Sequence, residues 1–251
     1  MNPKTIWSFY KDYIQGRAHI SHKSLNVIGK KRQHPLSVNT SLGCKNKHVI
    51  TNPYQTLEGF LKSLHVISFF YKKSLPILIV NTNPSFAFLI ENFFHKTDLN
   101  NSTVYYCNEK WVGGLLTNWK QASSRVKTYV KFSERFENFI LQNHINFPSY
   151  KKMALSFQGL KPRNRSKQIQ RPSLVFIVNP NENRHVVEES MRLHIPVMAI
   201  TDSNTPLLGI SFPIPGNSNS VHFVHYCLQW IARIITGCKK QQTKKSQPST
   251  V

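Results

Sequence analysis

The chain has 251 residues and a formal net charge of +22 at pH 7, with 33 Lys and Arg against 11 Asp and Glu. This length can bury a complete core, in one α/β domain with an insertion or in two small domains, but so large a charge requires an anionic partner. The four cysteines include no C-x-x-C pair, which argues against a disulfide framework or structural zinc, and no apolar run approaches the roughly 20 residues that span a bilayer.

Most of the positive charge lies outside two nearly neutral blocks. Residues 1–50 carry 9 basic and 1 acidic side chains, and residues 108–171 carry 13 and 3. Residues 51–107, with 4 and 3, and residues 172–238, with 3 and 4, are close to neutral. A solvated surface would spread its charge more evenly, so this distribution favours a folded framework whose basic appendages bind nucleic acid.

Three regions are predicted from this division. Residues 1–46 are basic with little sustained periodicity, so we predict an N-terminal arm that becomes ordered, if at all, on its partner. An α/β domain is predicted over residues 47–238. A basic, disordered tail is predicted at residues 239–251.

Strands and helices alternate in the first half of the domain. The apolar residues of 54–73 follow helical spacing, and Ile77–Val80 is a continuous apolar run, as expected for a strand covered on both faces. The other predicted elements are a short strand at 48–51, a helix from Asn83 to about His95, and a strand at 103–107.

A helical hairpin is predicted as an insertion at about residues 118–170. The pattern from Asn118 to Phe157 is helical but charged, and a break at residues 143–148 separates two helices. The basic segment Lys161–Lys167 has no hydrophobic anchor. It is either a solvated loop or a phosphate clamp, and the basic surroundings favour the clamp.

The last third of the domain continues the alternation. We predict strands at 174–178 and 196–200, a helix at 182–194 with Val186, Val187 and Met191 facing inward, a rigid loop at 213–217, and a helix at 221–235. About five alternations of strand and helix imply an α/β fold with a doubly wound parallel sheet and right-handed crossovers.

The run Tyr105–Lys120, YYCNEKWVGGLLTNWK, joins a strand to a helix through Gly113 and Gly114, and we call it the glycine corner. Glycine lets the backbone turn where a Cβ would clash. In one interpretation Trp111 and Trp119 belong to the core. In the other, the corner is presented to nucleic acid, with lysines and the backbone amides at the helix start binding phosphate. The corner by itself does not decide between them.

The sequence offers no catalytic site. The turn after the strand at 77–80 lacks the glycines of a dinucleotide-binding or P-loop motif, Asp202 has no second carboxylate to pair with, and no serine lies in a G-x-S-x-G elbow. We therefore predict that the chain is not an enzyme and has no metal, cofactor or small-molecule substrate.

Three separated segments resemble the ribosomal protein S2 family of bacteria and organelles. Asn108–Trp119 is similar to the family's NERWLGGMLTNF, and Pro172–Pro180, PSLVFIVNP, is similar to its PDLVFVIDP. Residues 188–217 contain further matches, to GIPVVAIVDTN and GIDYPIPGN. The three segments occur in family order, and the resemblance covers about residues 48–237.

The resemblance implies a flavodoxin-like sheet of about five strands with an inserted helical hairpin. It also implies a structural role in the small ribosomal subunit, binding ribosomal RNA near the junction of head and body beside neighbouring ribosomal proteins, with no membrane partner. The family's G-x-HFGH is reduced to Thr40–Cys44 here, and its lysine-bearing turn is Asn81–Pro84. This drift favours a mitochondrial ribosome over a plastid one.

RNA contacts are predicted for basic residues of the corner and the hairpin, which would bind phosphates and read RNA shape rather than base edges. The predicted set is Lys110, Trp111, Lys120, Arg125, Lys127, Lys151, Lys152, Arg163, Arg165 and Lys167. The alternative is a protein–protein scaffold of another organellar ribonucleoprotein, in which the hairpin docks a partner and the charge aids solubility. A nucleotide-binding enzyme is a third possibility.

Overall fold

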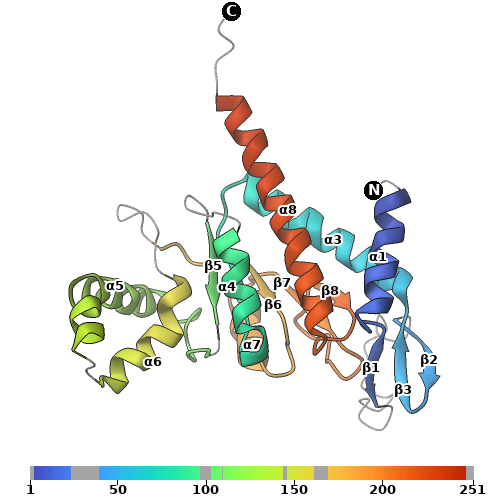
Figure 1. Ribbon diagram of the computed structural model, residues 1–251, viewed down its shortest axis with the longest axis horizontal. Coiled ribbons are helices and arrows are strands. Elements are labelled where there is room, and N and C mark those ends of the chain that lie inside the picture. The colour runs from blue at the N-terminus through green and yellow to red at the C-terminus, as the bar shows by residue number, and fades with distance from the viewer. Residues whose placement is uncertain are drawn as a thin grey trace, which may run out of the picture.

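The computed structural model describes residues 3–23, 40–96, 103–108, 110–143, 146–160 and 169–246. A five-stranded parallel sheet forms its centre, with the strand order β5-β4-β6-β7-β8 (Figure 1). The strands are β4 (Ile77–Val80), β5 (Val104–Cys107), β6 (Leu174–Ile177), β7 (Val197–Thr201) and β8 (Phe212–Pro215). This order is the doubly wound, flavodoxin-like arrangement, so the predicted α/β fold class is confirmed.

Alternate residues of the central strands enter two separate cores. On β4, Ile77 and Ile79 pack into one core, whereas Leu78 and Val80 pack into the other. Because side chains alternate across a strand, a strand that is apolar at every position needs cover on both faces. The face with Ile77 and Ile79 is covered by α3 (Pro53–Lys72), η3 (Pro84–Phe86), α4 (Ala87–Lys96) and α8 (Val221–Ser246). The face with Leu78 and Val80 is covered by α5 (Trp119–Gln142), α6 (Pro148–Phe157), η4 (Gln158–Leu160) and α7 (Arg184–Arg192).

The N-terminal segment belongs to the folded body, which corrects the prediction of an arm that orders only on its partner. α1 (Pro3–Gln15) buries Phe9 and Tyr13 in the core, where the ring of Phe9 stacks on Phe60 at 5.9 Å. The segment after α1 is fastened to the loop before α8, because the backbone N–H of Asn217 donates to Ala18 O at 2.9 Å. Residues 24–39 of the predicted arm lie outside the described residues.

A second, smaller sheet accounts for the strand predicted at 48–51. β1 (Ile20–Lys23), β2 (Ser41–Lys45) and β3 (His48–Thr51) pair antiparallel in the order β1-β3-β2. The fifth strand of the central sheet is instead β8, where we predicted a rigid loop. Pro213 and Pro215 are tolerated in β8 because it is an edge strand, and an edge strand does not need every backbone N–H for pairing.

The C-terminal helices differ from the prediction in two details. Val186 and Val187 of α7 are buried as expected, but Met191 is 41% exposed and does not face inward. α8 continues to Ser246, so residues 239–246, predicted to be disordered, are helical. Residues 247–251 lie outside the described part of the chain. Within that part, no helix is long and apolar enough to cross a membrane.

The predicted helical hairpin is confirmed and consists of α5 and α6. Aromatic rings hold the two helices together: Tyr129 lies 5.8 Å from Tyr150 and 6.2 Å from Phe157 between ring centroids. The hairpin lies beyond the β5 edge of the central sheet, at the opposite end of the molecule from α1 and the small sheet (Figure 1).

Candidate nucleic-acid interface

The glycine corner is anchored by one buried carboxylate, that of Glu189 on α7. Its Oε1 accepts hydrogen bonds from the backbone N–H of Gly114 at 2.8 Å and from Nε1 of Trp111 at 3.2 Å. Its Oε2 accepts from the backbone N–H of Leu116 at 2.9 Å and of Thr117 at 3.4 Å. Glu189 is 8% exposed, so this charge is almost wholly inside the protein and is stabilised by the donors that surround it.

This anchor changes the interpretation of the corner. In one of the two interpretations left open above, the backbone amides at the helix start bind phosphate, but those of Gly114, Leu116 and Thr117 already donate to Glu189. Trp111 and Trp119 are both partly buried and pack against the second core. The corner is therefore a rigid support, and the three amides bonded to Glu189 are not available to a phosphate.

A second network fixes the place where the chain leaves β5. The side-chain amide of buried Asn81, after β4, donates to Oδ1 of Asn108 at 2.8 Å, and Asn108 donates to Ala87 O at 3.1 Å. The Cys107 thiol donates to Lys110 O at 3.1 Å. Burial raises the pKa of this thiol to about 12, so the thiol keeps the proton that it donates. The backbone at Lys110 is therefore fixed by this hydrogen bond, and the exposed Lys110 side chain extends from a rigid position.

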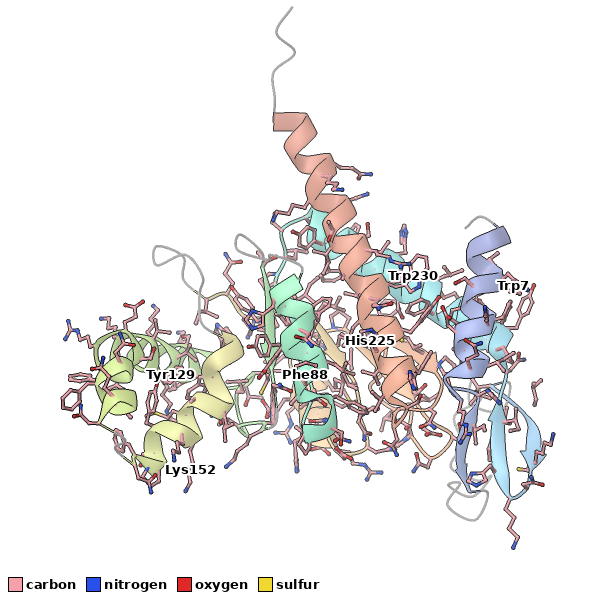
Figure 2. The ribbon with its side chains drawn as sticks, in the orientation of Figure 1. Trp7, Phe88, Tyr129, Lys152, His225 and Trp230 are labelled. Atoms are coloured by element: carbon pink, nitrogen blue, oxygen red, sulfur yellow. The ribbon has the colours of Figure 1, made fainter. Side chains whose placement is uncertain are left out.

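The predicted cations lie on three elements. Lys110 is on the corner, Lys120, Arg125 and Lys127 are on α5, and Lys151 and Lys152 are on α6. All six are exposed, and none forms an ion pair within the described residues. Figure 2 labels Lys152 on α6, on the hairpin side of the molecule. Arg163, Arg165 and Lys167 lie outside the described residues, so the phosphate clamp stays a prediction.

Helical geometry groups some of these cations into one stripe. With 3.6 residues per turn, Lys120 and Lys127 of α5 fall on the same face as Lys131 and Arg135, all within about 80°. The opposite face of α5 is the buried one, and it includes Val126. We call these four residues the α5 basic stripe. It extends for about 22 Å along the helix, and Glu134 flanks it.

Two members of the stripe were missing from the predicted set. Lys131 and Arg135 are exposed and follow Lys127 at intervals of four residues. That spacing was visible in the sequence and would have identified them. Arg125 lies apart from the stripe, in a shallow hollow between the corner and the start of α5 that Gly113, Asn118 and Phe157 also line.

The described residues do not assemble a metal site. No group of three His, Cys, Asp or Glu side chains in the described ranges could hold a metal ion. The carboxyl ends of the central strands carry mostly amides and hydroxyls, such as Asn81 and Asn179, together with the carboxylate of Asp202.

Comparison with known proteins identifies the family to which this chain is similar. The family described as Ribosomal protein S2 matches residues 17–237. The small ribosomal subunit protein uS2m of Marchantia polymorpha is 30% identical over 209 residues, which cover 81% of this chain and 84% of that protein. The small ribosomal subunit protein uS2 of Rickettsia conorii is 25% identical over 225 residues, covering 86% and 71%. That of Rhizobium etli is 26% identical over 243 residues, covering 94% and 89%. This chain belongs to the ribosomal protein S2 family.

Proposed function

We propose that the chain is a structural constituent of a small ribosomal subunit and binds ribosomal RNA through its hairpin. The observation that carries this proposal is the α5 basic stripe, four exposed cations on one face of a helix whose other face is buried. Such a row can follow an RNA backbone, because each cation neutralises a phosphate and releases a counterion. The names of the related proteins support the same role.

The contacts would position the protein rather than read a base sequence. Lysine and arginine bind phosphate oxygens, which carry no sequence information, and double-stranded RNA is recognised by shape. We assign phosphate contacts to Lys110, Arg125, Lys151 and Lys152 in addition to the stripe, and to Arg163, Arg165 and Lys167 after the hairpin. The indole N–H of Trp111 is already bonded to Glu189, so we assign to Trp111 a contact through its ring.

The ribosomal setting can be specified further. We propose a site near the junction of head and body, beside neighbouring ribosomal proteins, and a role that involves no catalysis and no cofactor. The relative uS2m supports a mitochondrial ribosome. The bacterial uS2 relatives are nearly as similar to this chain, and they do not argue against that location. A plastid ribosome is the alternative location.

A protein–protein scaffold is the second candidate function. It is favoured by exposed phenylalanines on the hairpin, Phe136 at 45%, Phe139 at 56% and Phe147 at 37%, which a protein partner would cover. Exposed apolar side chains that are close together are typical of protein interfaces.

Ribonuclease treatment separates the two candidates. We expect the tagged chain to co-sediment with small ribosomal subunits from organelles and to be released when the particle RNA is digested. Release should also occur at high salt, because the contacts are ionic. Retention on a protein-only particle after complete digestion would contradict RNA binding and support the scaffold.

A further inference from the structure

The hairpin has two parts that differ in charge. Residues 119–131, the part of α5 next to the glycine corner, carry four basic side chains and no acidic one. Residues 136–150, which include the end of α5 and the start of α6, contain no Lys or Arg and one acidic residue. We call residues 136–143 and 146–150 the hairpin tip. It lies at the end of the hairpin away from the central sheet (Figure 1).

The hairpin tip exposes aromatic rings instead of cations. Phe136 and Phe139 of α5 and Phe147, just before α6, are between 37% and 56% exposed. Both arms of the hairpin therefore contribute to one apolar surface. The three rings leave roughly 250 Å² of side-chain area in water. That area approaches the largest apolar patch on a typical monomer, and such patches are often functional.

The exposed rings are held in place by their neighbours. The ring centroid of Phe132 lies 5.0 Å from that of Phe136 and 5.9 Å from that of Phe147. Tyr150 lies 5.5 Å from Phe132 and stacks on Phe147 at 6.5 Å. A ring that is already fixed loses little conformational entropy when a partner covers it, so this surface is preorganised for binding.

The rings and the α5 basic stripe point in different directions. With 3.6 residues per turn, the centre of the pair Phe136 and Phe139 lies roughly 120° around the helix from the centre of the stripe. Arg135 is the last cation of α5, and the next one along the chain is Lys151. An RNA backbone that follows the stripe therefore leaves the rings uncovered.

We propose that the hairpin tip docks an apolar face of a neighbouring protein in the ribosomal particle, while the α5 basic stripe holds RNA. Aromatic residues are enriched and charged residues depleted at the centre of protein interfaces, as they are here. Sites that stack unpaired RNA bases on aromatic rings combine the rings with a positively charged groove, and residues 136–150 supply no Lys or Arg for one.

The charge of the hairpin tip also suits a protein from the same particle. Proteins that bind RNA are positively charged, so a second cationic surface would repel them. A tip without Lys or Arg avoids that repulsion. This inference rests on the proposed ribosomal function and assigns a surface to one of the protein neighbours. It makes the exposed phenylalanines compatible with RNA binding by the same hairpin.

Site-specific photo-crosslinking in assembled small subunits tests what covers the hairpin tip. The photoreactive residue p-benzoylphenylalanine takes the position of Phe139 in the full chain, the most exposed of the three rings. For comparison it takes the position of Ser124, an exposed, uncharged residue on the face of α5 that carries the stripe. We expect the adduct at Phe139 to contain protein and to survive ribonuclease, and the adduct at Ser124 to contain RNA.

Serine variants test whether the contact contributes to binding. Phe136→Ser with Phe139→Ser should lower the affinity for small subunits by about 20-fold and leave the affinity for isolated ribosomal RNA unchanged. The matched control, Phe88→Ser with Leu208→Ser, removes two exposed apolar side chains outside the hairpin and should change neither affinity. Because Phe136 also contacts Phe132, Phe139→Ser is measured alone, with an expected loss of about fivefold.

The outcomes separate this proposal from the ribosomal function on which it rests. An RNA adduct at Phe139, no adduct there while Ser124 crosslinks to RNA, or equal affinities of Phe139→Ser and the control for small subunits would overturn the protein contact alone. If the wild-type chain did not co-sediment with small subunits, both the contact and the proposed function would be wrong.

Discussion

The carboxylate of Glu189 accepts the backbone N–H of Gly114 at 2.8 Å, across 75 residues of sequence. This hydrogen bond and the other three that Glu189 accepts fix the corner from which α5 and the hairpin start. Replacing Glu189 with Ala leaves the amides of Gly114 and Leu116 and the indole of Trp111 without an acceptor. We expect the free energy of unfolding to fall by about 3 kcal/mol, because each unsatisfied buried donor costs about 1–3 kcal/mol.

Urea denaturation of the variant measures this loss, and the adjacent residue supplies the control. Glu188 is exposed on the same helix, so Glu188→Ala should change the free energy of unfolding by no more than about 0.5 kcal/mol. Equal effects at the two positions would show that Glu189 does not anchor the corner.

The backbone at Gly114 provides a second prediction. Its φ of +79° lies in the left-handed region, and a Cβ there would also come within 3.2 Å of Asn118 Nδ2. Gly114→Ala should therefore destabilise the protein by about 1–2 kcal/mol. Gly113 has open space around an added Cβ, so Gly113→Ala is the matched control and should be near neutral. Thermal unfolding compares the two, and a greater loss at Gly113 would contradict the geometry of the corner.

The packing of α1 makes a third prediction. Phe9 is fully buried and contacts the rings of Tyr13 and Phe60, whereas Trp7 on the same helix is 68% exposed. We expect Phe9→Ala to lower the free energy of unfolding by about 3–5 kcal/mol and Trp7→Ala to lower it by less than 1 kcal/mol. If Phe9→Ala left the stability unchanged, α1 would not be part of the body.

The central strands could be predicted because their chemistry is local. Ile77–Val80 and Val197–Thr201 are apolar runs flanked by turn residues, and no other element fits such runs in an α/β pattern. The α1 helix was not predicted although Ile6, Phe9 and Tyr13 follow helical spacing, because a basic composition such as that of the first 46 residues is typical of an arm that orders on its partner. β8 was missed because its two prolines indicate a loop unless the strand is known to lie at an edge.

The organisation of the site was less accessible from the sequence. The α5 basic stripe follows from spacing alone, and Lys131 and Arg135 could have been found. The role of Glu189 could not, because nothing in its neighbourhood on α7 indicates that a corner 75 residues earlier will place four N–H groups against it. The helical period of Met191 predicts an inward side chain, but this side chain packs against Gly209 of the loop before β8 and stays 41% exposed.

A pH dependence follows from the buried thiol of Cys107, whose pKa is raised from 9.0 to about 12 by burial. In the unfolded chain this thiol ionises near pH 9, whereas in the folded protein it stays protonated. Its contribution to stability is therefore complete below pH 9 and is lost as the pH rises towards 12, by about 1.4 kcal/mol per pH unit. Urea denaturation between pH 8 and 11 should show this decline.

The comparison with Cys107→Ala isolates the thiol from the lysines that also titrate in this range. The free energy of unfolding of the variant should fall less steeply with pH than that of the wild type. Parallel curves would mean that the thiol is not protected by burial.

The predicted clamp at Arg163, Arg165 and Lys167 gives a further prediction for RNA binding. Replacing all three with Gln should weaken the association with small-subunit ribosomal RNA and flatten its salt dependence, because three phosphate contacts are removed. Filter binding at several salt concentrations measures both quantities. An unchanged slope would remove the clamp from the interface.

The most direct test of RNA binding by the hairpin replaces the α5 basic stripe itself. The variant carries Gln at Lys120, Lys127, Lys131 and Arg135, and the control carries Gln at Lys11, Lys45, Lys47 and Lys62, with an equal change in net charge. The measurement is the affinity for small-subunit ribosomal RNA as a function of salt. We predict that the stripe variant lowers the slope of log K against log salt by roughly 3 and no longer co-sediments with small subunits, while the control retains both properties. Identical behaviour of the stripe variant and the control would contradict RNA binding by the hairpin.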